Sequence, residues 1–167
     1  MNIRNCNVND IDGIRQFLSR NKPLGAHSPA TYWVLFTYFN NSYFVAEENN
    51  KIIGFTGGLE STSQPGVFHL WQIGVDKEYR RKGYAEKLLY TVLKEIITMK
   101  CTKLQISMVP ENIASFRLFT KFAKKYRKEM VRLSLIDYYD SLSNFKENEI
   151  LYEIDISDIK IETLAQN

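Results

Sequence analysis

The sequence is poor in cysteine. Its 167 residues include only two, Cys6 and Cys101, and neither has the spacing of a metal ligand. Two cysteines exclude a disulfide framework, and so low a number is typical of a reducing compartment. No histidine lies near Cys101 in the sequence, which argues against a nucleophilic thiol there. We therefore expect a cytoplasmic protein that binds no metal.

Long apolar runs are also missing. The first residues, MNIRNCNVND, contain no apolar core of a signal peptide. Residues 28–46 carry no charged side chain, but a proline and four polar residues interrupt them: Pro29, Thr37, Asn40, Asn41 and Ser42. Such a stretch is too polar to span a membrane, and a buried helix followed by a strand explains it better. We expect no membrane partner.

The excess of positive charge is small, at +3. Residues 117–132 carry seven basic side chains and one acid, whereas residues 133–167 carry eight acids and two lysines. The lysines of the basic segment alternate with an apolar face, which is typical of an ordinary amphipathic helix. A nucleic-acid binder usually shows a larger or more clustered excess of positive charge. Nucleic-acid binding is therefore the least favoured of the functions considered.

The order of hydrophobic patterns predicts one mixed domain spanning residues 1–167. An apolar content of 44% suffices for a sizeable core in a chain of this length. Strand patterns occur in the segments 2–8, 43–48, 51–60, 66–76, 103–109, 130–136 and 150–156. Helix patterns begin after Asn9 or Asp10, after Ser28, after Gly83, and after Asn112 or Ser115. We expect the α/β (α+β) class, with a mixed central sheet of about six or seven strands flanked by about four helices.

Several local patterns support this order of elements. Asn49 and Asn50 separate two strand patterns and suit a two-residue hairpin turn. Ser28 followed by Pro29 is typical of a helix start. Apolar residues gather on one face of two predicted helices: Ala85, Leu88, Leu89, Val92, Leu93, Ile96 and Ile97, and then Phe116, Phe119, Phe122 and Tyr126. The strand–helix–strand unit over residues 67–109 is expected to be parallel.

A basic loop, DKEYRRKGYAEKLL, joins a predicted strand to the third helix. The first N–H groups of a helix have no internal partner and carry partial positive charge, so an anion fits beside them. Gly83 allows a phosphate to approach the backbone closely, and Ala85 keeps the next turn small. Arg80, Arg81 and Lys82 attract an anion from a distance. The residues alone predict a phosphate or pyrophosphate site, with a plain solvated turn as the alternative.

The basic loop resembles a known signature. Residues 80–85, RRKGYA, resemble the R/Q-x-x-G-x-G/A motif of the GCN5-related N-acetyltransferases, and VPENIASFRLFTKFA resembles the second motif of that family, an Asn-led helix. The preceding IGVDKEY is similar to the family's V-x-x-x-Y/W-R pattern. The resemblance implies the fold of that family and acetyl-CoA as cosubstrate. It also implies a set of cofactor-binding residues: Ile73, Gly74, Val75, Arg80, Arg81, Lys82, Gly83, Tyr84, Ala85, Asn112 and Phe119.

Four further segments resemble one branch of the family. SPATYWVLFTYF, FHLWQIGVD, VPENIASFRLF and EILYEI are similar, in this order, to segments of the diaminobutyrate acetyltransferases of ectoine synthesis. The likeness implies a homodimer that acetylates a primary amine of a small molecule, with 2,4-diaminobutyrate as one candidate. Three positions depart from the expected pattern: Gly25 replaces an acid, Ala30 a tyrosine and Lys146 a histidine. A peptide or protein N-acetyltransferase is therefore an alternative.

The family resemblance also implies how the transfer is assisted. A backbone N–H near Ile73 or Gly74 would stabilise the oxyanion, and Asn112 would contact the pantetheine arm. Many members use a tyrosine on the second-motif helix to protonate the leaving thiolate, and Phe119 takes its place here. A thiol with a pKa of about 8.5 can leave as a thiolate with help from water. A non-catalytic CoA-binding module is the alternative of another class.

The attacking amine must lose its proton, so a base must lie near it. The candidates are Glu60 at the end of the third strand, His69 in the fourth strand and Glu111 before the second-motif helix. A core histidine is the alternative for His69, and a solvated helix-start charge is the alternative for Glu111.

Four other residues are candidates for holding the acceptor. Trp71 and Gln72 are expected near the reaction centre, where Trp71 would take part in catalysis or attract an ammonium by cation–π contact. Core packing is the alternative for Trp71. Glu147 and Glu149 are expected to hold an ammonium group, with a solvated acidic face as the alternative.

Overall fold

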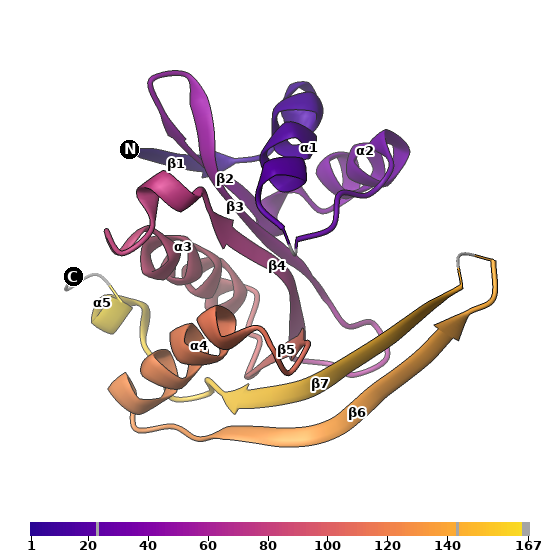
Figure 1. Ribbon diagram of the computed structural model, residues 1–167. Coiled ribbons are helices and arrows are strands. Elements are labelled where there is room, and N and C mark those ends of the chain that lie inside the picture. Colours follow the sequence, from indigo (N-terminus) through magenta and orange to yellow (C-terminus); the bar gives the residue numbers. More distant parts are fainter. Residues whose placement is uncertain (23, 143, 165–167) are drawn as a thin grey trace.

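The chain folds around one seven-stranded sheet (Figure 1). The computed structural model describes residues 1–22, 24–142 and 144–164, apart from the Glu147 side chain. The strands are β1 (Asn2–Asn5), β2 (Tyr43–Glu48), β3 (Lys51–Glu60), β4 (Val67–Val75), β5 (Lys103–Met108), β6 (Met130–Asp140) and β7 (Phe145–Asp155). Their order in space is β1-β2-β3-β4-β5-β7-β6. Only β4 and β5 pair in parallel within the described sheet, which confirms the mixed sheet and the parallel unit.

Helices cover both faces of the sheet. They are α1 (Ile11–Arg20), α2 (Pro29–Tyr38), α3 (Tyr84–Thr98), α4 (Ile113–Lys125) and the short α5 (Ile161–Leu164). In the described part of the chain, three 3-10 turns each lie between a strand and a helix: η1 (Val8–Asp10), η2 (Asn40–Ser42) and η3 (Lys77–Tyr79). One buried cluster lies between the sheet and α3, α4 and α5, and the second lies between the sheet and α1 and α2. The expected α/β (α+β) class is confirmed.

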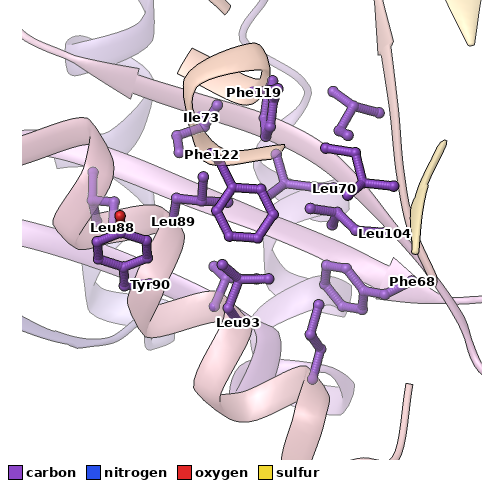
Figure 2. Close-up of a cluster of buried hydrophobic side chains, with 14 of the residues drawn as sticks. Phe68, Leu70, Ile73, Leu88, Leu89, Tyr90, Leu93, Leu104, Phe119 and Phe122 are labelled. Atoms are coloured by element: carbon purple, nitrogen blue, oxygen red, sulfur yellow. The ribbon is translucent and has the colours of Figure 1, made fainter. Parts of the chain in front are cut away.

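The sheet serves both clusters because side chains on a strand alternate between its faces. On β2, Phe44 and Ala46 belong to the cluster under α3 and α4, whereas Tyr43 and Val45 belong to the cluster under α1 and α2. Figure 2 shows the first cluster, where α3 and α4 direct their side chains onto the strands. Burying each large apolar side chain there contributes about 1.5–3 kcal/mol.

The hairpin turn and the cap of α2 form as the sequence predicts. Asn49 and Asn50 have φ angles of 51° and 59°, the left-handed backbone that a tight hairpin turn requires. The Ser28 hydroxyl accepts a hydrogen bond from the Thr31 N–H at 3.1 Å, and Pro29 opens α2. Neighbouring residues alone determine where this turn and this helix start lie, so both could be predicted without knowledge of tertiary contacts.

Helix α1 begins after Asp10, as the sequence predicts, but neither Asn9 nor Asp10 caps it with a side chain. A 3-10 turn precedes the helix, and the Asn7 side chain caps that turn instead by accepting the Asn9 N–H at 2.9 Å. The Asp10 carboxylate accepts the Asn7 N–H at 2.8 Å and is also paired with Arg4. The capping prediction was wrong because Asp10 is engaged in this reciprocal arrangement, and α1 has no side-chain cap of its own.

The last two strands are longer than the predicted segments 130–136 and 150–156. They reach Asp140 and begin at Phe145, so the hairpin extends over residues 130–155. Residues around its turn are held by polar contacts: Lys146 pairs with Asp137 at 3.1 Å, and the Tyr139 hydroxyl donates to Asn144 Oδ1 at 2.8 Å. Both faces of this arm are largely exposed, so the period-2 alternation that marks a half-buried strand is absent.

Candidate functional site

The structure splits the sheet between β4 and β5 (Figure 1). Their parallel pairing runs from Val67 opposite Lys103 to Leu70 opposite Ile106 and then ends. Beyond this point β5 continues to pair with β7, while β4 continues beside β3. The second half of β4 therefore presents backbone groups with no strand partner on one side. Such open backbone needs hydrogen-bond partners from elsewhere.

A β-bulge in β4 lies where the split begins. Gly57 pairs with Gln72 and Gly58 pairs with Leu70, so Trp71 is an extra residue without a partner on β3. Residues three positions apart on a regular strand point to opposite faces of the sheet. Because of the extra residue, Leu70 and Ile73 point to the same face, and both belong to the cluster under α3 and α4. The bulge thereby places Trp71 and Gln72 beside the split without disturbing the core.

The direction of the open N–H groups follows from the antiparallel pairing of β3 and β4. The Asp76 N–H donates to the Ile53 carbonyl at 2.8 Å, so it points toward β3. Alternation along the strand then turns the Gly74 N–H toward β3 and the Ile73 and Val75 N–H groups toward the split. Arg80 Nε donates to the Val75 carbonyl at 3.1 Å on that open side, in agreement with this alternation.

The basic loop forms the mouth of a cavity of about 380 Å³, named here the loop cavity. Gly83 is the N-cap of α3 with a φ of 77°, and no atom lies within 4 Å of the position that a Cβ would take. Its left-handed backbone and open surroundings leave the first N–H groups of α3 accessible to an anion. Arg80, Arg81 and Ala85 line this cavity, together with Ile73, Gly74 and Val75.

Two residues of the basic loop point elsewhere. The Lys82 ammonium lies 5.0 Å from the centre of the Tyr79 ring, and the Tyr84 ring stacks on Tyr79 at 6.2 Å. Neither residue lines the loop cavity. Lys82 and Tyr84 therefore support the shape of the loop, and the backbone and the two arginines form the surface that faces an anion.

A second cavity, of about 540 Å³ and named here the cleft cavity, adjoins the first one. Four residues line both cavities: Leu24, Ile73, Asn112 and Ser115. Trp71, Gln72 and Glu149 line the cleft cavity, and the fully buried Phe119 forms part of its wall. The Gln72 side chain is fixed, because its Nε2 donates to the Gly25 carbonyl at 2.8 Å.

Asn112 lies where the two cavities meet. Its Oδ1 accepts the Ser115 N–H at 3.2 Å, so it caps α4 as the sequence predicts. The cap uses only the carbonyl oxygen of the amide, and the NH₂ group has no partner among the described residues. Asn112 can therefore cap the helix and donate to a ligand at the same time.

Three other predicted residues lie outside both cavities. Glu60 is exposed and lines a separate cavity of about 570 Å³ beside Ser61 and Pro65, at the end of β3 where β4 and β5 are still paired. Glu111 is exposed in the turn before α4. His69 is half-buried on β4 and lines neither cavity; burial lowers its pKa, partly offset by Glu149. The Glu147 side chain lies outside the described part of the structure.

Two side chains that line the cleft cavity, those of His27 and Phe145, were not among the site residues predicted from the sequence. His27 comes from the loop before α2, and Phe145 comes from the start of β7. The His27 ring lies 4.3 Å from the Trp71 ring at an interplanar angle of 32°. His27 is far from Trp71 in the sequence, and no local motif marks His27. Only the packing of the α1–α2 loop against β4 brings them together.

Phe116 was expected on the buried face of α4, but it is 41% exposed. It contacts Tyr152 of β7 edge-on, with the ring centres 5.9 Å apart. The first turn of α4 reaches the rim of the sheet, so only Phe119 and Phe122 of this row are buried.

Among the described residues, no helix is long and apolar enough to cross a membrane.

Comparisons with known proteins give a consistent picture. Diaminobutyrate acetyltransferase EctA from Paenibacillus lautus, in complex with L-2,4-diaminobutyric acid and coenzyme A, has a similar fold, with a TM-score of 0.82 and 24% identity over 96% of this chain and 97% of that one. The ribosomal-protein-S18-alanine N-acetyltransferase from Escherichia coli is also similar, with a TM-score of 0.72 and 17% identity over 95% and 96% of the two chains.

Sequence relatives point to the same group. The chain is 34% identical to the L-2,4-diaminobutyric acid acetyltransferase of Halalkalibacterium halodurans over 64% of this chain and 56% of the relative. It is 31% identical to that of Marinococcus halophilus over 68% and 66%. The chain thus spans less than two thirds of the length of either relative.

A family model decides the membership. The model described as the acetyltransferase (GNAT) family matches residues 11–123, a range that contains the basic loop, the split between β4 and β5 and most of α4. The resemblance inferred from the two motifs is confirmed: this chain belongs to the acetyltransferase (GNAT) family.

Proposed function

We propose that this protein is an acetyl-CoA-dependent N-acetyltransferase that acts on a primary amine of a small molecule. The observation that carries the proposal is the split sheet, because it joins the loop cavity at Arg80 and Arg81 to the cleft cavity at Trp71. A long, narrow cosubstrate with an anionic end fits such a pair of connected cavities. The relatives named above support this activity.

The residues of the loop cavity fit the anionic end of acetyl-CoA. The N–H groups at the start of α3 would bind its pyrophosphate, with Gly83 leaving room for close approach. Arg80 and Arg81 would add charge from one side of the cavity. The open backbone groups of Val75 and the NH₂ group of Asn112 would bind the amide groups of the pantetheine arm.

Acetyl-CoA supplies an acetyl thioester, and the chain's own residues assist its transfer to the amine. Negative charge develops on the acetyl oxygen during attack, and a fixed N–H donor stabilises such charge. The Ile73 N–H points into the split, whereas the Gly74 N–H points toward β3, so Ile73 is the better of the two predicted donors. Phe119 has no proton to give to the leaving sulfur, which would depart as a thiolate.

The acceptor end of the cleft cavity fits a small amine better than a peptide. Phe145 and Glu149 of the β6–β7 arm line this end of the cavity, where a peptide would need an open path. Trp71 offers an aromatic face and Glu149 a carboxylate, which together attract an ammonium group. The relatives make 2,4-diaminobutyrate the first acceptor to test, although Gly25 and Ala30 depart from the expected pattern.

Two measurements test the proposed function. Calorimetry should detect acetyl-CoA binding in the micromolar range, and release of free thiol should depend on an amine from a panel of diamines and diamino acids. Absence of acetyl-CoA binding contradicts the proposal. Binding without thiol release from any amine favours the second candidate, a non-catalytic CoA-binding module, which Phe119 in place of a general acid supports.

We further propose a single domain in the cytoplasm. One seven-stranded sheet and the two clusters on its faces support a single domain. The buried free thiols of Cys6 and Cys101 support a reducing compartment.

We also propose a homodimer formed through β6. This strand lies at the edge of the sheet, and three apolar side chains on it are 46% to 51% exposed: Val131, Leu133 and Leu135. An exposed apolar edge strand of this length is a ready template for pairing with another chain, and a second copy would cover it.

Leu135→Lys is expected to convert this dimer to a monomer, because it places a charge in the proposed interface. Light scattering coupled to size exclusion measures the molar mass. The matched control is Val8→Lys, at a residue that is 43% exposed in η1, and it should stay dimeric. A monomeric wild type, or a Leu135→Lys variant that remains a dimer, contradicts the proposal.

A further inference from the structure

His27 occupies a position in the cleft cavity that the sequence motifs do not account for. It lies in the loop between α1 and α2, immediately before the Ser28 cap, and it is half-buried. Its ring faces the Trp71 ring at 4.3 Å and lines the same cavity as Trp71, Gln72 and Glu149. The imidazole therefore forms part of the wall at which the acceptor amine would be held.

The backbone of His27 is fixed on both sides. Its N–H donates to the Tyr32 hydroxyl at 3.3 Å, and its carbonyl accepts from Arg15 Nε at 3.2 Å. The Tyr32 ring, which is fully buried, meets the imidazole edge-on with ring centres 5.9 Å apart. Held between Tyr32 and Trp71, the imidazole loses little freedom when a ligand binds, and such preorganisation favours a functional side chain.

The ring nitrogens of His27 are available. Neither nitrogen has a hydrogen-bond partner among the described residues. Burial lowers the pKa of His27, and no carboxylate among the described side chains raises it. The imidazole is therefore neutral at pH 7 and can accept a proton at an unoccupied nitrogen.

The side chains that surround His27 on α1, α2, β4 and β7 are compatible with a neutral imidazole. Arg15 of α1 and Tyr32 of α2 contact its backbone, and β4 presents the uncharged Trp71 and Gln72. Glu149 of β7 lines the same cavity and would attract the ammonium of the acceptor. A neutral imidazole and a carboxylate in one cavity suit two different tasks, proton removal and cation binding.

We propose that His27 is the general base that takes a proton from the acceptor amine. This inference rests on the acetyl transfer proposed above. The ammonium loses one proton to a ring nitrogen of His27, and the amine nitrogen then forms a bond to the acetyl carbon. The bond between that carbon and sulfur breaks, and the sulfur leaves with its electron pair. The sulfur takes up the second proton of the nitrogen, and the imidazolium returns its own proton to water.

The other titratable candidates are less well placed. Glu60 lines a different cavity, and His69 lines neither the loop cavity nor the cleft cavity. Glu149 is in the right cavity, but a carboxylate is a weaker base than a neutral imidazole at pH 7. His27 alone among the histidines therefore combines access to the cleft cavity with a suitable protonation state.

The first test compares His27→Gln with His69→Gln, at the only two histidines of the chain. With L-2,4-diaminobutyrate and 1,3-diaminopropane as acceptors, His27→Gln should lower kcat by about 10²- to 10⁴-fold. The affinity for acetyl-CoA, measured by calorimetry, should be unchanged. The wild-type profile of kcat/KM should fall as pH drops through a pKa below about 6.5, and this acid limb should persist in His69→Gln and vanish in His27→Gln.

Two further measurements separate catalysis from a structural role. Added imidazole should restore activity to His27→Ala in proportion to the neutral imidazole present, which a merely misfolded variant would not show. In the wild type, NMR titration of the two histidines should show the His27 pKa falling when L-2,4-diaminobutyrate and CoA are both added, because an ammonium then lies beside the ring. His69 should titrate unchanged.

Each outcome decides the matter. An acid limb that survives in His27→Gln, no rescue by imidazole, or a His27 titration that ignores the amine overturns the proposal. Loss of the limb in His69→Gln assigns the base to His69 instead. Failure of the proposed function is distinguishable, because the wild type itself then releases no thiol and binds no acetyl-CoA.

Discussion

Replacing Gly83 with valine is expected to abolish binding of acetyl-CoA, with a rise in Kd of at least about 100-fold. Gly83 has a φ of 77°, a backbone conformation that costs a β-branched residue on the order of 1–3 kcal/mol. The valine side chain would also occupy the open space beside the first N–H groups of α3, which is where a phosphate must come close. The steric block and the backbone strain are both expected to raise the Kd for acetyl-CoA.

Calorimetry with acetyl-CoA measures the effect, and thermal melting shows that the variant is folded. The control is Lys82→Val, which places the same side chain next to Gly83 at a residue whose φ is not positive and whose ammonium lies over the Tyr79 ring. Its Kd should rise by only a few-fold, as expected for the loss of one distant charge. A Gly83→Val protein with wild-type affinity would show that the pyrophosphate binds elsewhere.

The features that the sequence predicts well are those decided by local chemistry. The Asn49–Asn50 turn has left-handed backbone at both residues, and Ser28 and Asn112 cap their helices through their own side chains. The apolar row of α3 is buried because its spacing matches one helix face. The basic loop belongs to this group, since a glycine between a strand and a helix is visible without any tertiary contact.

The features that the sequence does not predict depend on pairing between distant segments. The split after Leu70 exists because β4 and β5 diverge there, while β5 stays paired with β7 along its other edge, and no residue of β4 alone indicates this. His27 reaches the cleft cavity only through packing of the α1–α2 loop on Trp71. Glu60 was a plausible base by its place at the end of a strand, yet it lies where the two strands are still joined. Proximity in three dimensions therefore separates His27 from Glu60 as a candidate base.

The bulge at Trp71 depends on a glycine in the neighbouring strand. Gly58 pairs with Leu70 across β3 and β4, and the β4 backbone comes close to it there. A Cβ on Gly58 would lie 2.1 Å from the His69 carbonyl oxygen and 2.8 Å from the Leu70 Cα. Both are backbone atoms, which cannot move aside as a flexible side chain would.

Gly58→Ala is therefore expected to destabilise the protein by about 3 kcal/mol, the upper part of the range for an overpacked core. Denaturant unfolding followed by circular dichroism measures the change. The control is Gly25→Ala, since no atom lies within 4 Å of a Cβ at Gly25 and its stability should change by less than about 0.5 kcal/mol. If Gly58→Ala unfolds like the wild type, β3 can separate from β4 at low cost, and the bulge is not what holds Trp71 at the cleft cavity.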